Sequence, residues 1–177
     1  MRVTQEIEIT PTSVLLNGNP IQVETTGDKM LVELYRRYAG DYPKFFKMDT
    51  LCRLGFIAAE ILLKEPTDSP KPTAIILANR SASIKNDTDY LATISDGNYY
   101  PSPSLFVYTL PNIVTGEIAI RHHIQGETSF YILQNPEQLE SILLSTFTFH
   151  LSPLLAGWVE CSAPNEFYAK LQIIWNN

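Results

Sequence analysis

The run Ala74–Ala78 constrains the fold of this chain more than any other part of the sequence. Its five residues, AIILA, are all apolar and stand between a proline-rich stretch, residues 65–73, and a polar stretch, residues 79–90. A strand with one face in water alternates apolar and polar residues, whereas a short unbroken apolar run is typical of a strand covered on both faces. Helices must then lie on each side of the sheet. The run predicts a layered α/β fold.

The segments before this run predict helices for those layers. Aspartate is a good N-cap, and apolar residues from Leu51 to Leu62 recur at helical spacing after Asp49. A shorter helix is predicted between Asp28, as its cap, and Gly40, where the pattern stops.

Strand patterns gather at the two ends of the chain. The opening residues alternate between apolar and polar, and the turn-forming residues 17–20 lie between VLL and IQV, which predicts a hairpin. Residues 153–160 and 166–175 predict a second hairpin around the turn-like residues 161–165. Between the ends, the patterns predict strands at Ser104–Thr109 and Ser129–Leu133, a short helix at Tyr90–Ile94, and loops at residues 41–46 and 65–73.

The charge balance argues against nucleic acid as a partner. The 177 residues carry 13 basic and 19 acidic side chains, for a net charge of −6, and no basic cluster exceeds the pair Arg36-Arg37. Charged residues are scattered through the first ten positions, and no stretch approaches the roughly 20 apolar residues of a membrane span. We expect a cytoplasmic protein without a signal peptide.

Cysteine and glycine usage predicts neither a metal site nor a cofactor. Cys52 and Cys161 are the two cysteines, without a CxxC motif or zinc-type spacing, and we expect both to be buried small hydrophobes. No glycine-rich phosphate-binding motif occurs. His122 and His123 are adjacent, so on a helix they point to different faces and do not chelate one metal. His150 is expected in a last helical turn, with a structural role.

Four segments together resemble β-ketoacyl synthases. Leu110–Leu133 resembles the part of those enzymes that leads into the nucleophilic cysteine. Met48-Asp49 with the later pair Ala58-Ala59 resembles an early helix of the family, Ala74–Ser83 the next strand and its loop, and Leu155–Glu160 the strand after the nucleophile helix. The resemblance implies one ketoacyl-synthase-like domain over residues 1–177, an α/β layered sandwich like the N-terminal half of a thiolase or ketoacyl synthase, with hairpins at both ends.

The resemblance also implies that the catalytic residues are missing. The family's cysteine is expected nine residues after Gly126, where this chain has Asn135. Asn135-Pro136-Glu137-Gln138 has the residue types of a capping box, so Asn135 is also predicted to be a helix N-cap. The two catalytic histidines of the family come from a second half of the enzyme. Asn135 therefore stands at the nucleophile position without a nucleophile.

A non-catalytic partner subunit is the function that the resemblance implies, in fatty-acid, polyketide or aryl-polyene-type biosynthesis. Members of the family dimerise through the strand before the nucleophile, so the expected partner is a second copy or an active ketoacyl synthase, with an acyl carrier protein as a further candidate. Consecutive strand residues point to opposite faces, so Phe130 and Tyr131 cannot enter one core. The implied interface consists of Ser129, Phe130, Tyr131, Ile132 and Leu133.

Two other functions fit the residues. A small acyltransferase or thioesterase would use Cys161 or a serine of residues 79–83, although no base is identifiable and no G-x-S-x-G elbow occurs. A stand-alone acyl-binding α/β module would hold its ligand between the loops Asn79–Asp89 and Gly97–Ser104. An acyl channel would be lined by aromatic residues around the motif, namely Tyr99, Tyr100, Phe106, Tyr108, Phe130 and Tyr131.

Overall fold

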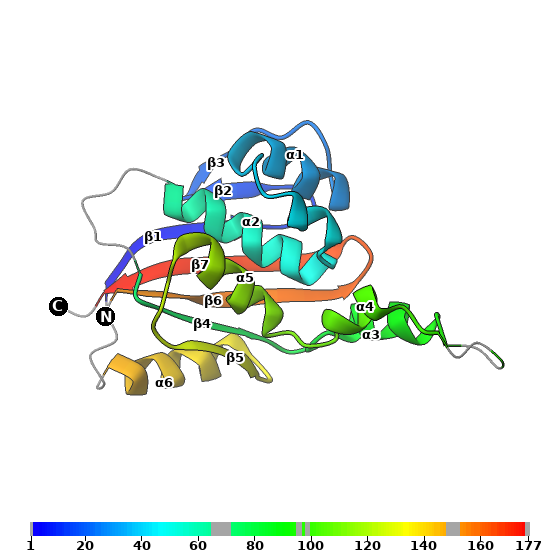
Figure 1. The fold of residues 1–177 in the computed structure, drawn as a ribbon. Coiled ribbons are helices and arrows are strands. Elements are labelled where there is room, and N and C mark those ends of the chain that lie inside the picture. Colours follow the sequence, from blue (N-terminus) through cyan, green and yellow to red (C-terminus); the bar gives the residue numbers. More distant parts are fainter. Residues whose placement is uncertain (1, 65–71, 95–96, 98–99, 148–152, 176–177) are drawn as a thin grey trace.

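One seven-stranded mixed sheet organises the chain (Figure 1). The computed structural model describes residues 2–64, 72–94, 97, 100–147 and 153–175. The strand order across the sheet is β3-β2-β1-β7-β6-β4-β5. The strands are β1 (Arg2–Ile9), β2 (Val14–Leu16), β3 (Asn19–Pro20), β4 (Ala74–Asn79), β5 (Thr128–Ile132), β6 (Leu154–Ala163) and β7 (Glu166–Trp175).

The sheet has a parallel part and an antiparallel part. Strands β5, β4 and β6 are parallel, while β6–β7, β7–β1, β1–β2 and β2–β3 pair antiparallel. Parallel neighbours need crossover connections, and helices provide them here, whereas hairpins join β1–β2, β2–β3 and β6–β7. Strands β1 and β7 come from the two ends of the chain and pair without a direct connection. The predicted hairpins at both ends are therefore confirmed, and so is the layered α/β fold.

Helices cover both faces of the sheet. They are α1 (Asp28–Tyr38), α2 (Thr50–Lys64), α3 (Ile84–Leu91), α4 (Pro103–Val107), α5 (Ile113–His122) and α6 (Pro136–Phe147), with a short 3₁₀-helix η1 (Pro43–Lys47). Buried residues of α1, α2 and α5 pack on one side of the sheet, the front face, while Leu139 and Leu143 of α6 pack on the other, the back face. Helices α3 and α4 project beyond the end of the sheet (Figure 1).

Strand β4 is buried along its whole length, as its apolar run predicts. Ile75 and Leu77 join the front core, and Ala74, Ile76 and Ala78 join the back core, all with 0% exposure. Each buried isoleucine or leucine side chain contributes roughly 1.5–3 kcal/mol to stability. Both faces therefore need a helix layer.

The predicted caps are partly right. Asp49 caps α2, because its Oδ1 accepts a hydrogen bond from the Cys52 N–H at 2.9 Å. The N-cap of α1, however, is Gly27 and not Asp28. Gly27 has a φ of +60°, and the Asp28 N–H is satisfied by the Asn165 side chain at 3.2 Å. Asn165 comes from the distant β6–β7 turn, so local sequence did not reveal this cap.

Three local predictions in the middle of the chain are wrong. Ser104–Thr109 is not a strand, because helix α4 begins at Pro103 and the Ser102 hydroxyl accepts a hydrogen bond from the Leu105 N–H. The helix predicted at Tyr90–Ile94 lies earlier, as α3. The loop predicted at residues 41–46 contains η1, where proline stands in the first turn. Residues 65–71 of the predicted proline-rich loop lie outside the described residues.

The two edges of the sheet differ. At one edge, β3 has only two residues, both exposed, and one of them is Pro20, which has no backbone N–H to donate. At the other edge, β5 pairs with β4 along one side only. Residues 127 and 133 exchange hydrogen bonds with β4, so by alternation the backbone groups of Thr128, Phe130 and Ile132 point away from it. The open edge is therefore β5.

Two glycines make a matched test of packing. A Cβ on Gly157 of β6 would lie 2.0 Å from the Lys170 carbonyl oxygen, while one on Gly116 of α5 would meet nothing within 4 Å. We predict that Gly157→Ala lowers the free energy of unfolding by about 1–3 kcal/mol through overpacking. Gly116→Ala should raise it by about 1 kcal/mol, because alanine is the better helix former. Urea unfolding measures both, and equal effects would contradict the packing described for β6.

Candidate functional site

The carboxyl ends of the parallel strands meet at one edge of the sheet, and the N-terminus of α6 lies beside them. Arg80 follows β4, Asn135 precedes α6, and Glu160 lies near the end of β6. With their neighbours they line a pocket of about 550 Å³. Its lining residues are Arg80, Ser81, Gln134, Asn135, Pro136, Trp158, Glu160, Ser162 and Tyr168.

Asn135 caps α6, as the sequence predicts. Its Oδ1 accepts a hydrogen bond from the Gln138 N–H at 3.2 Å. The reciprocal bond of the capping box is displaced by one residue, because the Gln138 side chain accepts from the Gln134 N–H at 2.7 Å. Asn135 is exposed and borders the pocket. Its amide can donate and accept hydrogen bonds, but it is neither a nucleophile nor a base.

Glu160 gives the pocket one open acceptor. Its Oε2 accepts a hydrogen bond from the Arg80 N–H at 2.8 Å, which ties the end of β6 to the end of β4. Its Oε1 is buried and has no hydrogen-bond partner within the described part of the chain. A buried acceptor is costly to leave unpaired, so a donor brought to this pocket would bind there favourably.

The two cysteines lie in the core and not in this pocket. Cys52 and Cys161 are both free and both 2% exposed, which confirms that they are buried small hydrophobes. Burial raises the pKa of Cys161 to about 12, and burial also raises the pKa of Cys52 well above its usual value. Neither thiol is ionised near neutral pH, so neither supplies a thiolate nucleophile.

Ser83, a serine candidate for the nucleophile, is held in structural contacts. Ser83 is buried and its hydroxyl lies 2.6 Å from the Thr109 carbonyl oxygen and 3.0 Å from Asp87 Oδ1. Asp89 is paired with Lys85 at 2.7 Å. These contacts stabilise the start of α3, and they include no histidine among the described residues.

The five predicted interface residues belong to the open edge and the residue after it. Phe130 packs against the front core, while Tyr131 and Leu133 pack against the back core, which confirms that Phe130 and Tyr131 point to opposite faces. Ile132 is 50% exposed. Ser129 donates to Glu127 Oε1 at 2.7 Å, so its hydroxyl is already satisfied within the chain.

The aromatic residues proposed for an acyl channel do not gather. Tyr100 is 89% exposed and Phe106 58% exposed on the projecting segment, while Tyr108 is buried in the front core at 6%. Phe130 and Tyr131 lie on opposite faces of the sheet. Tyr99 is outside the described residues. These side chains form no common lining.

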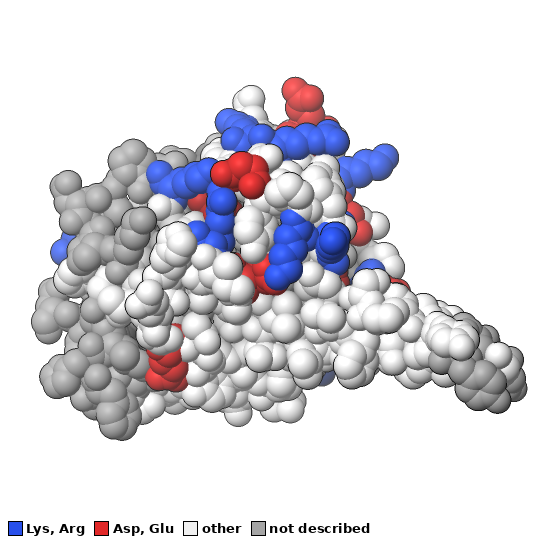
Figure 2. Space-filling view, viewed as in Figure 1, with Lys and Arg blue, Asp and Glu red and all other residues white. Residues whose placement is uncertain are grey.

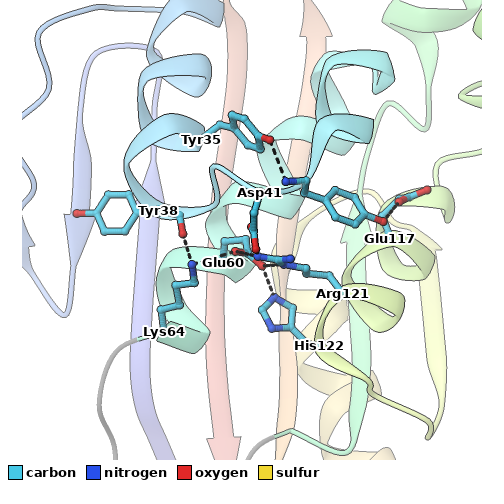
Figure 3. Close-up of polar contacts among 9 residues, drawn as sticks. Tyr35, Tyr38, Asp41, Glu60, Lys64, Glu117, Arg121 and His122 are labelled. Carbon is cyan, nitrogen blue, oxygen red and sulfur yellow. Dashed lines mark hydrogen bonds and ion pairs between the residues drawn. The ribbon is translucent and has the colours of Figure 1, made fainter.

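A buried carboxylate joins α2 to α5, and the sequence analysis missed it (Figure 3). Glu60 is 0% exposed, and its Oε1 lies 2.9 Å from Arg121 Nε and 3.0 Å from His122 Nε2. Arg121 also pairs with Asp41 at 2.6 Å, and Lys64 lies 3.7 Å from Glu60. The sequence signal was present, because Glu60 interrupts an apolar helix stripe.

This arrangement keeps Glu60 ionised. Burial by itself would raise the pKa of Glu60, but the contacts with His122 and Arg121 outweigh it and lower the pKa to about 2. The guanidinium of Arg121 also lowers the pKa of Asp41. His123, by contrast, is exposed and ends α5 with a φ of +57°, so the two histidines diverge as predicted. His150 lies outside the described residues.

A second buried carboxylate, that of Glu117, lies on α5 one turn before Arg121. Glu117 is 5% exposed, accepts a hydrogen bond from the Tyr42 hydroxyl at 3.0 Å and forms an ion pair with Lys44. Burial, with the bond to Glu117, raises the pKa of Tyr42 to about 12. Together with the Arg121–Asp41 pair, these contacts fix the segment between α1 and α2 on α5.

Cationic side chains gather on the front face over α1, η1 and α2, as Figure 2 shows. The exposed members of this cationic face are Lys29, Arg36, Arg37, Lys44, Lys47 and Lys64. They are spread over 36 residues of sequence, so they form no basic cluster along the chain and gather only in the fold. A chain with net charge −6 thus presents one locally positive surface.

Two kinds of feature are missing from the described residues. They contain no group of three or more histidine, cysteine, aspartate or glutamate side chains that would hold a metal ion. None of their helices is long and apolar enough to cross a membrane.

Comparison with solved structures identifies the fold. No protein-family model and no curated protein matches the sequence. A similar chain occurs in the structure of a ketosynthase in complex with its chain length factor, from Xenorhabdus doucetiae. The match covers 99% of the present chain and 79% of the ketosynthase-system chain, with a TM-score of 0.67 and 12% sequence identity. The chain has a ketosynthase-like fold. The ishigamide ketosynthase/chain length factor matches 96% of it, with a TM-score of 0.67 at 15% identity, but over only 61% of that longer chain.

The capping role of Asn135 can be tested on stability. We predict that Asn135→Ala lowers the free energy of unfolding by about 1 kcal/mol, because the Gln138 N–H loses its acceptor. Asn135→Asp keeps an acceptor at the N-cap and should retain the stability. Thermal and urea unfolding of the parent and the two variants would measure these differences in stability. An alanine variant as stable as the parent would contradict the capping role of Asn135.

The ionised state of Glu60 makes stability depend on pH. The pKa of Glu60 is depressed in the folded protein, so its contribution is complete above the usual value of 4.5 and is lost as pH falls towards about 2. We expect Glu60→Gln to be clearly less stable than the parent at pH 7, because Arg121 and His122 lose their shared carboxylate. This difference should narrow steadily below pH 4.5. A constant difference from pH 7 to pH 3, measured by urea unfolding, would exclude the ionised pair.

Proposed function

We propose that this protein is a non-catalytic ketosynthase-like partner subunit, of the chain-length-factor type, that works beside an active ketosynthase in fatty-acid, polyketide or aryl-polyene-type biosynthesis. One observation carries the proposal. The residue at the N-terminus of α6, directly after the edge strand of a ketosynthase-like sheet, is Asn135, a helix cap without nucleophilic chemistry. In this proposal Asn135 occupies the nucleophile position of the related enzymes.

The chemistry of condensation supports this assignment. Carbon–carbon bond formation by ketosynthases requires a thiolate to carry the acyl chain and groups that polarise the second substrate. Here the two thiols are buried in the core with raised pKa values, and His122 is engaged with Glu60. The residues that would be reactive are occupied by structural contacts.

The partner is proposed to add to the edge strand β5 through Ser129–Leu133. The outward backbone groups of Thr128, Phe130 and Ile132 are available for pairing, and Ile132 exposes an apolar side chain beside them. An open apolar edge is a hazard for aggregation unless another chain covers it. Two neighbours of similar fold come from ketosynthase and chain-length-factor systems, which favours a ketosynthase over a second copy as the partner.

The projecting segment of α3 and α4 adds support for a protein partner. Of the twelve large apolar side chains that are exposed among the described residues, seven lie between Ile84 and Leu110. Contiguous exposed apolar surface marks interaction sites on stable proteins. This segment leaves the sheet at the end where β4 and β5 finish, so one partner can contact both (Figure 1).

An acyl carrier protein is the second proposed partner, at the cationic face. Carrier proteins of acyl chains are acidic, and an acidic surface is attracted to the clustered lysines and arginines over α1, η1 and α2. Lys44 is held there by Glu117, which limits the conformational freedom lost on binding.

The proposal also includes a single domain over residues 1–177 and a cytoplasmic location. The two free cysteines, which form no disulfide, favour the cytoplasmic location.

The two alternative functions have less support. An acyltransferase or thioesterase needs an activated nucleophile. The Cys161 thiol is buried with a raised pKa, and the Ser83 hydroxyl is held by the Thr109 carbonyl oxygen and Asp87 in the structural contacts at the start of α3. A stand-alone acyl-binding module needs an apolar cavity between the loops Asn79–Asp89 and Gly97–Ser104. The aromatic side chains near those loops diverge, with Tyr100 and Phe106 exposed.

The non-catalytic assignment can be tested directly by measuring condensation activity. We predict that the purified protein alone does not condense malonyl and acyl thioesters. Co-expressed with the ketosynthase encoded nearest to it, it should form an active complex, and Asn135→Ala should leave the turnover of that complex within about twofold. Condensation by the protein alone, or loss of turnover in the Asn135→Ala complex, would refute the non-catalytic assignment. Radiolabelled malonyl incorporation measures both.

The edge strand can be tested with a charge that leaves the fold intact. Ile132 is half exposed, so Ile132→Lys should fold normally but disfavour pairing at β5. Val3→Lys, on an exposed position of β1, is the matched control. We expect Ile132→Lys to abolish co-elution with the ketosynthase in size-exclusion chromatography with light scattering, while Val3→Lys retains it. Retention by both variants would place the partner elsewhere.

A further inference from the structure

One side of α5 carries no lysine, arginine, aspartate or glutamate. The charged residues of this helix, Glu117 and Arg121, point toward α2 and the segment before it, where their ion-pair partners lie. With 3.6 residues per turn, four other residues come together on the opposite side of the helix axis. These residues form the α5 stripe, which runs from the N-cap to the C-cap and consists of Asn112, Gly116, Ala119 and His123.

The α5 stripe is open in the described part of the chain. A Cβ added at Gly116 would meet nothing within 4 Å, and Ile120, at the border of the stripe, is 63% exposed. A surface helix of a globular protein normally turns charged and polar residues to water. An uncharged helix side with an exposed isoleucine therefore indicates a surface that another protein covers.

The α5 stripe lies on the side of the open sheet edge. Helix α2 packs on β1, β7 and β6, whereas α5 packs on β4 and β5 (Figure 1). The side of α5 that is turned away from α2 is therefore the side of β5, beyond which the described sheet ends. The stripe and the outward backbone groups of β5 are thus parts of one continuous surface.

The spacing of strands and helices says what would cover the stripe. Neighbouring strands lie about 4.8 Å apart. Helix α5 covers the pair β4–β5, and a partner of the same layered fold has a helix over its own edge pair. When the two edge strands pair, the axes of these helices lie two strand spacings apart, or about 9.6 Å. Packed helices have axes roughly 8–10 Å apart, so the two helices would be in contact.

We propose that α5 packs along a helix of the ketosynthase partner, the helix that covers the edge strand of that partner. This inference rests on the proposed function and extends its interface from the strand β5 to the helix layer. Gly116 and Ala119 let the partner helix come close, and Ile120 packs beside it. The facing side of the partner helix is uncharged, because a charge buried against Ala119 and Ile120 would have no partner.

Substitutions at Gly116 test how closely the partner helix approaches. Gly116→Phe adds bulk where the isolated chain has space, and phenylalanine is a better helix former than glycine, so the fold should be retained. The Kd of the complex with the ketosynthase, measured by analytical ultracentrifugation, should rise at least tenfold for Gly116→Phe and stay within threefold for Gly116→Ala. Equal Kd values for the parent and both variants would overturn the proposal.

A matched pair of surface charges locates the contact. Ile120→Lys should also raise the Kd at least tenfold. Leu144→Lys, at a position of α6 that is 59% exposed, should leave the Kd unchanged. Equal weakening by the two variants would reject a specific contact at α5. A benzophenone side chain in place of Ile120 should crosslink to a helix of the ketosynthase, and crosslinks to its strands or loops alone would overturn the proposal.

The same measurements separate this inference from the proposed function. A parent protein that binds no ketosynthase contradicts the proposed function and the helix contact together. A complex that is lost with Ile132→Lys but keeps its Kd with Gly116→Phe and Ile120→Lys contradicts the helix contact alone. Self-association of the parent that Ile120→Lys abolishes would assign the α5 stripe to a second copy of this chain and reject the proposal.

Discussion

Burial of both faces of β4 is the constraint on which the rest of the structure depends. Its side chains alternate between two cores, with Ile75 and Leu77 in front and Ile76 behind, all fully buried. The strand must therefore lie inside the sheet and between helix layers. The crossovers that a parallel strand requires then bring the ends of β4 and β5 to the same edge as the start of α6. The candidate site follows from this one apolar run.

Features determined by neighbouring residues were predictable, and those determined by distant contacts were not. The apolar run, the hairpins and the caps at Asp49 and Asn135 depend on local patterns, and the structure confirms them. Residues Ser104–Thr109 have strand propensity, but the Ser102 cap and the proline after it favour a helix that projects into solvent. Glu60 and its partners on α5 are about sixty positions apart, so no window of sequence joins them.

The two faces of the molecule carry opposite charge for structural reasons. On the front, the buried carboxylates Glu60 and Glu117 turn inward and leave the cations of α1 and η1 at the surface. On the back, Glu6 and Glu8 alternate with core residues of β1 and face outward.

Pro20 at the far edge limits how such chains assemble. A sheet grows by adding strands at free edges, and a molecule with two free edges can continue without end as a filament. Here β3 has two residues and one of them cannot donate a backbone hydrogen bond, so that edge disfavours a further strand. Pairing through β5 joins one neighbour and then stops. The short, proline-containing edge thus favours a closed pair over a filament for any complex that forms through β5.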